Sequence, residues 1–296
     1  MKKYACIDIG GTAIKYGIVN EAGEIEWRKE MDTEAHQGGK AILNKAIVIV
    51  ETLMQETAIS GICISTAGMV DTEKGEIFYA APLIPDYAGT TFKKTMEERF
   101  HVPCEVENDV NCAGLAEYRA GAARGSKIAL MLTIGTGIGG CMIVDGKVFH
   151  GFSNSACEVG YMHMQESDFQ TLGSTKTLVK KVAARKGESE EVWNGHRIFE
   201  AAKKGDACCI AAIEEMTDVL GQGIANICYI INPQVVVLGG GIMAQEAFLE
   251  GRITQALERY LVPALAKATR IAFARHRNDA GMLGAFYHFV GLHVER

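Results

Sequence analysis

Three short glycine-rich segments each follow an apolar stretch and carry groups that suit phosphate binding. They read DIGGT at residues 8–12, TIGTGIGG at 133–140 and GGG at 239–241. Because glycine lacks a Cβ, the backbone N–H groups of such a bend can approach an anion closely and form a concave donor surface. Each segment taken alone is more often a plain hairpin turn. The three segments together favour a phosphate-binding site.

The middle segment also matches the GxGxxG pattern of dinucleotide-binding folds, through Gly135, Gly137 and Gly140. That pattern requires a helix directly after the glycines. The residues that follow, CMIVDGKVF at 141–149, predict a strand with an Asp-Gly turn instead. The context therefore excludes a Rossmann site and places these glycines in a hairpin.

Asp8 ends the first apolar run and strengthens the phosphate interpretation. A buried carboxylate without a partner costs several kcal/mol. A hydrated Mg²⁺ on a triphosphate would supply such a partner, acting through water, and an ion pair with Lys15 is the alternative. The predicted nucleotide-binding residues are Asp8, Ile9, Gly10, Gly11, Thr12, Lys15, Thr133, Gly135, Thr136, Gly137, Gly239, Gly240 and Gly241.

Composition limits the classes of protein that remain. The chain has 296 residues, 48% of them hydrophobic and 22% charged, with a formal net charge of −6. Without a basic cluster, this balance argues against a nucleic-acid partner. Nine cysteines include no CxxC pair, so no structural zinc site is expected. No apolar run approaches membrane-span length, and we expect a cytoplasmic protein without a membrane partner.

The hydrophobic pattern predicts strands at 4–9, 13–20 and 24–31 in an antiparallel meander, then a helix at 41–56 and a strand at 61–65. Further elements are expected as strands at 103–109, 128–149 (two strands) and 234–241, and as helices at 110–120, 172–186, 197–204, 207–231, 242–260 and 281–292. Because no Pro-, Gly- or Ser-rich linker separates the halves, two α/β domains in close apposition are expected. The expected domains are 1–118, with the C-terminal helix 281–296 packed on it, and 119–280.

Asp109 has the chemistry of a general base. An alcohol does not ionise by itself near neutral pH, so phosphoryl transfer to it benefits from a carboxylate within hydrogen-bonding reach. Asp109 stands between a predicted strand and the helix from Val110. Its alternative role is a helix N-cap, which Asn108 could fill equally well.

Six motifs occur along nearly the whole chain in the order typical of one family. They are DxGGT at 8–12, SxxGxVD at 65–71, ENDxN at 107–111, TxGTGIGG at 133–140, ExG at 158–160 and GGG at 239–241. In these motifs the sequence resembles the ROK family of sugar kinases. The resemblance implies a two-domain actin/hexokinase/Hsp70-like (ribonuclease H-like) α/β fold with mixed sheets, and ATP bound in the interdomain cleft. It also implies that Asp109 removes the proton from the sugar hydroxyl that attacks the γ-phosphate.

The resemblance further implies a sugar pocket. Asn108, Asp109 and Glu158 would grip neighbouring hydroxyl groups, and Gly68 would contact the sugar through its backbone. For Glu158 the alternative is an ordinary solvated acid, and for Gly68 it is a plain turn. The segment 152–164 around Glu158 has a low charge density, which favours the pocket.

The departures from the family pattern concern the region after Glu158. Most family kinases read ExGH and then carry a cysteine cluster that holds zinc, whereas this chain has Tyr161 and no cysteine in 164–175. His163 alone cannot form a four-ligand site and is expected at the surface. Gln170 takes the place of a second pocket glutamate.

Tyr161 offers a flat apolar face on which a further ring or an aglycone could stack. The sequence EVGYM, the loss of the zinc ligands and the ending RNDAGMLGAFYHF at 277–289 resemble the β-glucoside kinases of the family. This implies phosphorylation of the 6-hydroxyl of the non-reducing glucose of cellobiose and similar sugars, with ATP and Mg²⁺. Glucose, another hexose or an N-acetylhexosamine is the alternative substrate, and a homodimer is the family expectation.

Two other classes of protein were compared with the kinase. Sugar-sensing regulators carry a helix-turn-helix module before the phosphate loop, whereas Asp8 begins that loop near the first residue, and the acidic charge balance also argues against DNA binding. An actin-like or chaperone-like ATPase would not need the sugar-type polar residues or the base at Asp109. The kinase is therefore the preferred prediction.

Overall fold

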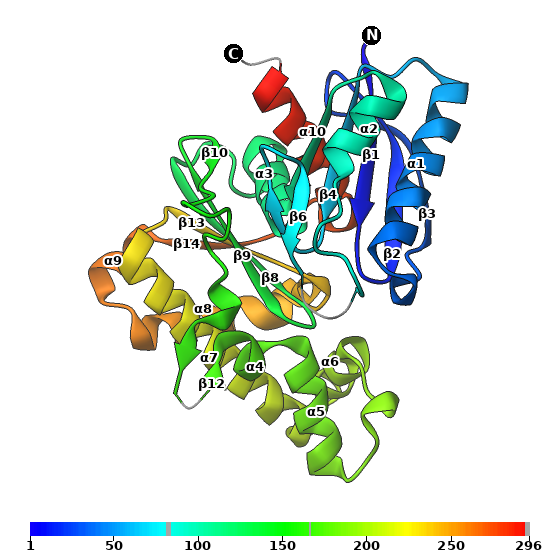
Figure 1. The fold of residues 1–296 in the computed structure, drawn as a ribbon. Helices are drawn as coiled ribbons and strands as arrows, with labels where there is room; N and C mark the ends of the chain where they lie inside the picture. The colour runs from blue at the N-terminus through cyan, green and yellow to red at the C-terminus, as the bar shows by residue number, and fades with distance from the viewer. Residues whose placement is uncertain (81–83, 166, 294–296) are drawn as a thin grey trace. The chain divides into compact units, whose positions relative to one another are not determined.

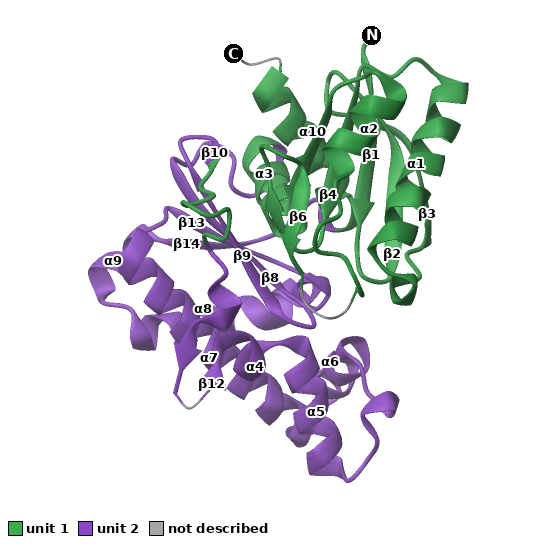
Figure 2. Cartoon of the chain, in the orientation of Figure 1, with its two compact units in different colours: residues 1–119, 148–156, 278–296 green, residues 120–147, 157–277 purple. Residues whose placement is uncertain are grey.

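The computed structural model describes residues 1–80, 84–165 and 167–293. The chain divides into two compact units (Figure 2): unit 1 comprises residues 1–119, 148–156 and 278–296, and unit 2 comprises residues 120–147 and 157–277. Each unit has its own sheet and its own hydrophobic core. Residues 148–156, expected in the second domain, belong to unit 1. Residues 294–296 of the predicted C-terminal helix lie outside the described residues.

The sheet of unit 1 has the strand order β3-β2-β1-β4-β7 (Figure 1). Strands β1 (Lys3–Ile9), β2 (Ala13–Asn20) and β3 (Ile25–Asp32) form the predicted antiparallel meander. Strands β4 (Gly61–Thr66) and β7 (Cys104–Asn108) continue the sheet in parallel to β1. The predicted mixed sheet is therefore confirmed.

The parallel strands of unit 1 end together. Asp8 pairs in register with Ser65, and Thr66 pairs with Asn108. The carboxyl ends of β1, β4 and β7 consequently meet at one edge, where the side chains and loops of α/β sheets commonly bind ligands.

Helices cover the sheet of unit 1. The remaining elements of this unit are α1 (Gly39–Glu56), the hairpin of β5 (Met69–Asp71) and β6 (Glu76–Tyr79), α2 (Phe92–Phe100), α3 (Asp109–Ala120) and α10 (Ala280–His293), with a short 3₁₀ turn η1 (Ala35–Gln37). The helix α1 buries a stripe that includes Ile42, Ala46, Ile49 and Leu53, as expected of an amphipathic helix. The helix α10 packs on β1, β4 and β7.

The sheet of unit 2 has the strand order β10-β9-β8-β13-β14, and its bounds are β8 (Ile128–Ile134), β9 (Ile138–Val144), β10 (Lys147–Val148), β13 (Val235–Gly239) and β14 (Arg270–Phe273). Strand β8 is antiparallel to β9 and parallel to β13. Asp145 and Gly146, with φ of 47° and 83°, form the predicted tight turn. The strand predicted over 234–241 ends at Gly239.

Most of unit 2 is helical. Its helices are α4 (Phe169–Gly173), α5 (Thr175–Lys186), α6 (Gly195–Lys203), α7 (Ala207–Ile231), α8 (Glu246–Tyr260) and α9 (Pro263–Ala268); it also has the 3₁₀ turns η2 (Val159–Tyr161), η3 (Glu190–Val192) and η4 (Gly241–Gln245), and the small hairpin of β11 (His163–Met164) and β12 (Ser167–Asp168). Between β14 and α10, where the chain passes from unit 2 to unit 1, it forms a last 3₁₀ turn, η5 (Arg277–Asp279).

One helix prediction in unit 2 is wrong. The single helix expected over 172–186 is interrupted at Ser174, whose hydroxyl accepts a hydrogen bond from the N–H of Thr177 at 3.4 Å. Serine is a strong N-cap because its side chain satisfies an amide at the start of a helix. A new helix, α5, therefore begins at Thr175. In the described parts of the chain, no helix combines the length and apolar character needed to cross a bilayer.

A close approach of α10 to α3 depends on one glycine. A Cβ on Gly284 would collide with the carbonyl oxygen of Cys112, whereas a Cβ on Gly291, on the exposed end of the same helix, would approach Arg119 only to 4.0 Å. A glycine in a helix normally weakens it relative to alanine by about 1 kcal/mol. Replacement of glycine by alanine should therefore lower the stability of the protein at position 284 and raise it at position 291.

We expect Gly284→Ala to lower the free energy of unfolding by about 1–3 kcal/mol, because overpacking forces the two helices apart. Gly291→Ala should raise it by up to about 1 kcal/mol. Urea denaturation followed by circular dichroism measures both changes. A Gly284→Ala protein as stable as the parent would contradict the described packing of α10.

Candidate active site

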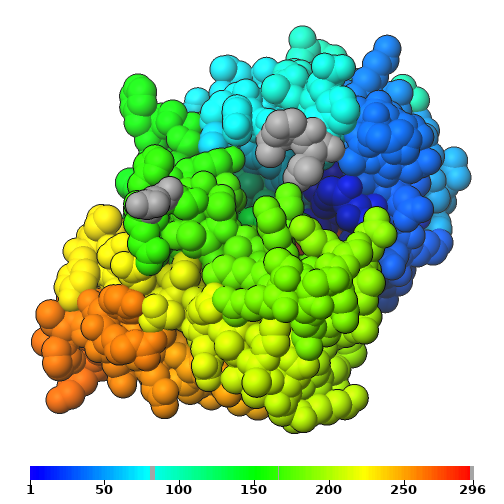
Figure 3. Space-filling view, turned by 90° about the horizontal axis from the view of Figure 1, so that it is seen from below, coloured from blue at the N-terminus to red at the C-terminus, as the bar shows by residue number. Residues whose placement is uncertain are grey.

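The turn between β1 and β2 is fixed by the backbone and open to its surroundings. The N–H of Gly10 donates to Ala13 O at 3.0 Å, and the hydroxyl of Thr33 donates to Gly10 O at 2.7 Å. Gly11 and Thr12 are exposed, and this first part of the chain reaches the surface in Figure 3, where it is darkest blue. A Cβ on Gly11 would meet no atom within 4 Å. The bend is thus ordered and has free space in front of it.

Asp8 lies at the base of this turn with a side chain only 16% exposed. It accepts a hydrogen bond from Ser65 Oγ at 2.7 Å, and Lys15 Nζ lies 3.8 Å from Oδ2. Burial is the largest influence and raises the pKa of Asp8 above its ordinary value, while Ser65 and Lys15 lower it by less. The ion pair that we considered as the alternative is present, but it does not offset the burial of the carboxylate.

A carboxylate in this condition fits a hydrated magnesium ion. Magnesium keeps several of its waters and commonly binds proteins through one or two carboxylates. Among the described residues, no group of three or more His, Cys, Asp or Glu side chains is arranged to hold a metal ion by itself. Asp8 would therefore face the ion as a single carboxylate.

Asn108 caps the helix α3 and orders the residues around it. Its Oδ1 accepts from the N–H of Asn111 at 3.1 Å and of Val110 at 2.9 Å. Its Nδ2 donates to Gly68 O at 2.9 Å and to Asp109 Oδ1 at 3.1 Å. Of the two cap candidates, Asn108 reaches the third residue of the helix, and Asp109 becomes the first helical residue.

Gly68 occupies a position that only glycine fits well. Its φ is +96°, and a Cβ there would lie 2.9 Å from Tyr79 O. Through the amide of Asn108, the structure brings Gly68, Asn108 and Asp109 together. They lie at the same edge of the sheet as Asp8, because β1, β4 and β7 end there.

In unit 2 the second and third glycine segments also come together. Gly239 pairs in register with Thr133. Gly240 has a φ of +101°, and a Cβ there would collide with Ile134 O at the end of β8. The glycine at position 240 therefore allows the two segments to run against each other.

A cavity of about 760 Å³ opens beside these glycines. Its lining includes Gly135, Thr136, Thr175, Trp193, Gly241 and Ile242. The N–H of Thr175, at the start of α5, donates to Gly135 O at 2.8 Å. The buried Oγ1 of Thr175 has no hydrogen-bond partner within residues 1–80, 84–165 and 167–293.

This cavity has the character of a nucleotide pocket. Cβ atoms built on Gly135 and Gly241 would meet nothing within 4 Å, so their backbones border open space. Trp193 and Ile242 supply apolar walls, while the start of a helix carries partial positive charge that favours phosphate. The residues present therefore fit a nucleoside phosphate.

Glu158, Tyr161 and Gln170 form a second group in unit 2. Gln170 Oε1 would lie 2.6 Å from a Cβ on Gly137 and 3.1 Å from one on Gly160, so it joins the middle glycine segment to the ExG motif. The N–H of Tyr161 donates to Glu158 O at 3.2 Å, and Tyr161 as a whole residue is 48% exposed. Burial raises the pKa of Glu158 above its ordinary value. His163 is exposed in β11.

The predicted site residues thus form one group in unit 1 and two groups in unit 2. Sequence reasoning missed the pocket walls Thr175, Trp193 and Ile242, and it assigned no role to Glu107 and His150. Glu107 stands inside the ENDxN motif, which was the one available signal. The others come from elements far apart in the sequence and carry no local pattern.

The ROK family profile matches residues 4–291. The chain belongs to the ROK family. Protein CPE0188 of Clostridium perfringens is 50% identical over 289 residues, with 98% of each chain covered. The beta-glucoside kinase of Listeria monocytogenes (serovar 1/2a) is 31% identical, with 97% of each chain covered. The ROK family glucokinase of Streptomyces griseus, solved with glucose and AMPPNP, is 26% identical with a TM-score of 0.84 over 96% of this chain and 97% of its own.

These relatives confirm two predictions made from the motifs. The family is the one that the six motifs resemble. The likeness to the Streptomyces griseus structure, together with the mixed sheets, confirms the α/β fold of the actin and hexokinase type.

The raised pKa of Asp8 leads to a prediction about stability. Between its ordinary value of 3.8 and the raised value, the native state binds the proton more tightly than the unfolded state. Stability is therefore lost as the pH rises through this window and remains reduced at pH 7. We expect Asp8→Asn to have a higher Tm than the parent at pH 7, with a smaller difference near pH 4. Scanning calorimetry at both pH values measures this effect.

Asp145→Asn, in the exposed turn after β9, serves as the matched control and should change Tm equally at both pH values. A lower Tm of Asp8→Asn at pH 7 would show that the protein itself already compensates the charge of Asp8.

Proposed function

We propose that this ROK family protein is an ATP-dependent sugar kinase that phosphorylates the 6-hydroxyl of a β-glucoside such as cellobiose. The observation that carries the proposal is the position of Asp109 at the carboxyl edge of β7, bonded to Asn108 and close to Gly68. In a chain of this family, that arrangement supports a general base beside a pocket for sugar hydroxyls.

Each residue of unit 1 has a defined task in this proposal. Asp109 takes the proton of the attacking hydroxyl, which an alcohol does not lose by itself near neutral pH. Asn108 holds the Asp109 carboxylate through Nδ2, at 3.1 Å, and keeps it at the first turn of α3. Asp8 would contact a hydrated magnesium ion through water. When bound, ATP would supply the phosphoryl group, and magnesium would spread the negative charge on it.

Unit 2 supplies the nucleotide and sugar contacts of the proposal. The glycines of 133–140 and 239–241 hold phosphate through their N–H groups, and the cavity beside them takes the nucleoside. Glu158 binds sugar hydroxyls, and the ring of the half-exposed Tyr161 offers a stacking face for a second sugar ring or an aglycone.

Two relatives support different substrates. The 31% identity to the Listeria monocytogenes beta-glucoside kinase and the tyrosine at position 161 support a β-glucoside. The Streptomyces griseus glucokinase, which holds glucose, supports free glucose as the second candidate. A panel of glucose, mannose, fructose, N-acetylmannosamine, cellobiose and gentiobiose, followed by ADP release, separates them. We expect the highest kcat/KM for cellobiose or gentiobiose.

A preference for glucose in this panel would favour the second candidate. ATP hydrolysis that does not depend on sugar would argue for an ATPase. Sugar binding without ADP release would argue for a regulator.

We expect Asp109→Asn to lower kcat by about 10²- to 10⁴-fold, the usual contribution of a general base. Nucleotide affinity and Tm should remain close to those of the parent, because asparagine preserves the shape of the side chain. Steady-state kinetics with the best sugar of the panel and nucleotide titration measure these quantities. The control is Asp218→Asn, which removes a surface ion pair with Arg259 and should leave kcat unchanged. Turnover near that of the parent would refute the role of Asp109.

Valine at Gly11 or Gly135 tests the phosphate contacts. A side chain at either position meets no protein atom within 4 Å, and neither glycine has a positive φ, so the fold should tolerate it. It would nevertheless occupy the space where phosphate lies. We expect the KM for ATP to rise on the order of 10-fold or more with little change in Tm. Gly251→Val, with equally open surroundings on α8, should leave the KM for ATP unchanged. If the KM for ATP were also unchanged in the Gly11 and Gly135 variants, these two glycine segments would not contact the phosphates of ATP.

A further inference from the structure

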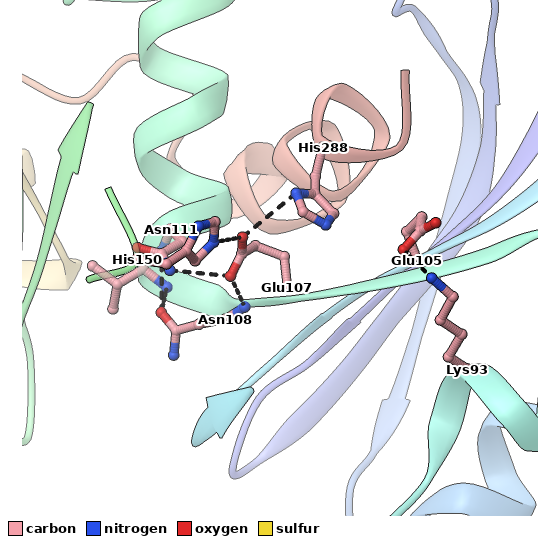
Figure 4. Close-up of polar contacts among 8 residues, drawn as sticks. Lys93, Glu105, Glu107, Asn108, Asn111, His150 and His288 are labelled. Atoms are coloured by element: carbon pink, nitrogen blue, oxygen red, sulfur yellow. Dashed lines mark hydrogen bonds and ion pairs between the residues drawn. The ribbon is translucent and has the colours of Figure 1, made fainter. Parts of the chain in front are cut away.

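A buried carboxylate lies directly before the proposed base. The Glu107 side chain is 0% exposed at the end of β7. Its Oε1 accepts from the backbone N–H of Asn108 at 2.7 Å and from Asn111 Nδ2 at 3.0 Å. Its Oε2 lies 2.6 Å from His150 Nε2, and Figure 4 shows these contacts converging on the one carboxylate. The proposed kinase reaction does not use Glu107 directly.

The contacts of Glu107 connect the first turn of α3 to a distant segment. Asn108 and Asn111 belong to the end of β7 and the start of α3, next to Asp109. His150 belongs to the segment 148–156, in which the N–H of Ala156 donates to His150 O at 3.1 Å and closes a loop. A buried carboxylate that loses one of its partners is left with an uncompensated charge, and the groups around it rearrange. Loss of the His150 side chain should therefore change the position of the Asn108 backbone, whose N–H is bonded to Glu107.

We propose that His150 is a positioning residue for phosphoryl transfer: through Glu107 it fixes the Asn108 backbone and thereby the direction of the Asp109 carboxylate. This inference rests on the proposed kinase function. His150 itself does not need to touch the sugar or the nucleotide.

The charges around the pair favour an imidazolium bonded to a carboxylate. Burial is the largest influence on the pKa of His150 and lowers it, but the hydrogen bond and the charge of Glu107 together raise it above its ordinary value. Burial likewise raises the pKa of Glu107, and His150, His288 and Asn111 together lower it below its ordinary value. Burial lowers the pKa of His288, whose Nδ1 lies 3.4 Å from Glu107 Oε2.

A cavity of about 480 Å³ borders this network. His150 shares the lining of this cavity with the titratable residues Glu73, Lys93, Glu105, His288 and His293. Glu107, at the end of β7, contacts His150 directly. Because the pKa of His150 is raised above its ordinary value, its charged pair with Glu107 persists to a higher pH than a free histidine would allow and is lost as the pH rises through that pKa.

The same strand contains a matched pair. Glu105 lies two residues before Glu107 and on the same face of β7. It is bonded to His293 Nε2 at 2.7 Å and to Lys93 Nζ at 2.8 Å; the latter contact appears in Figure 4. The contacts of Glu105 involve α2 and α10 and not the start of α3. His293 therefore controls for the loss of a histidine partner from a buried glutamate that does not orient the base.

The test compares His150→Ala and His150→Gln with His293→Ala and His293→Gln in the full-length protein. We expect His150→Ala to lower kcat on the order of 10- to 100-fold, with the KM for ATP unchanged. His150→Gln keeps an N–H donor and should recover most of kcat. In the parent protein, kcat should decline at alkaline pH as His150 loses its proton, and in His150→Gln this decline should be absent. The His293 variants should lower Tm alone.

Hydrogen exchange provides a second measurement that does not depend on activity. In His150→Ala, the amides of 108–112 and 148–156 should exchange faster together, and in His293→Ala they should not. If the parent protein phosphorylates no sugar, the proposed function fails, and the exchange data still test the coupling. Equal kcat in the parent and in His150→Ala, equal effects of the two alanine variants, or unchanged exchange at 108–112 would each overturn the proposal.

Discussion

The structure of unit 1 depends on how carboxylates are satisfied where three parallel strands end. Strands β1, β4 and β7 bring Asp8, Glu107 and Asp109 to one region of the sheet, and a carboxylate leaves water only when other groups replace the lost hydration. Asp8 and Glu107 meet this constraint differently, and the difference separates their roles.

Asp8 is less compensated than Glu107, since burial outweighs Ser65 and the Lys15 charge at 3.8 Å. The collision that a Cβ on Gly281 would make with its carboxylate shows how closely α10 packs on it. Glu107 is the opposite case, because hydrogen bonds reach both of its oxygens. An acid with an unmet charge suits an ion, whereas a fully bonded acid suits structural support. Such a division of tasks is common where stability is traded for function.

Glycine has a related part in unit 2. Gly240 lets the chain pass against the end of β8, and Gly135 and Gly241 leave their backbones facing open space. Glycine therefore serves two purposes in this region: at position 240 it allows close contact with another protein segment, and at positions 135 and 241 it leaves room for a ligand. Ser174 adds to it by ending α4 and starting α5, which places the first N–H of α5 on Gly135 O at 2.8 Å. The pocket is thus built from the β8–β9 turn, the starts of α5 and α6, and the 3₁₀ turns η3 and η4.

The sequence by itself determined the elements with a strong local period and the motifs on them: the meander of β1 to β3, the helix 207–231 with its observed bounds, and the glycine segments. It left the cap of α3 open between Asn108 and Asp109, because both side chains can accept the same amides. Only the tertiary structure chose Asn108 and brought His150, in residues 148–156, to Glu107 in unit 1. The interruption of the predicted helix at Ser174 has a local cause, the serine N-cap, which hydrophobic periodicity does not report. Hydrophobic periodicity reports which face of an element is buried, but the partner of a buried charge is set by contacts between distant segments.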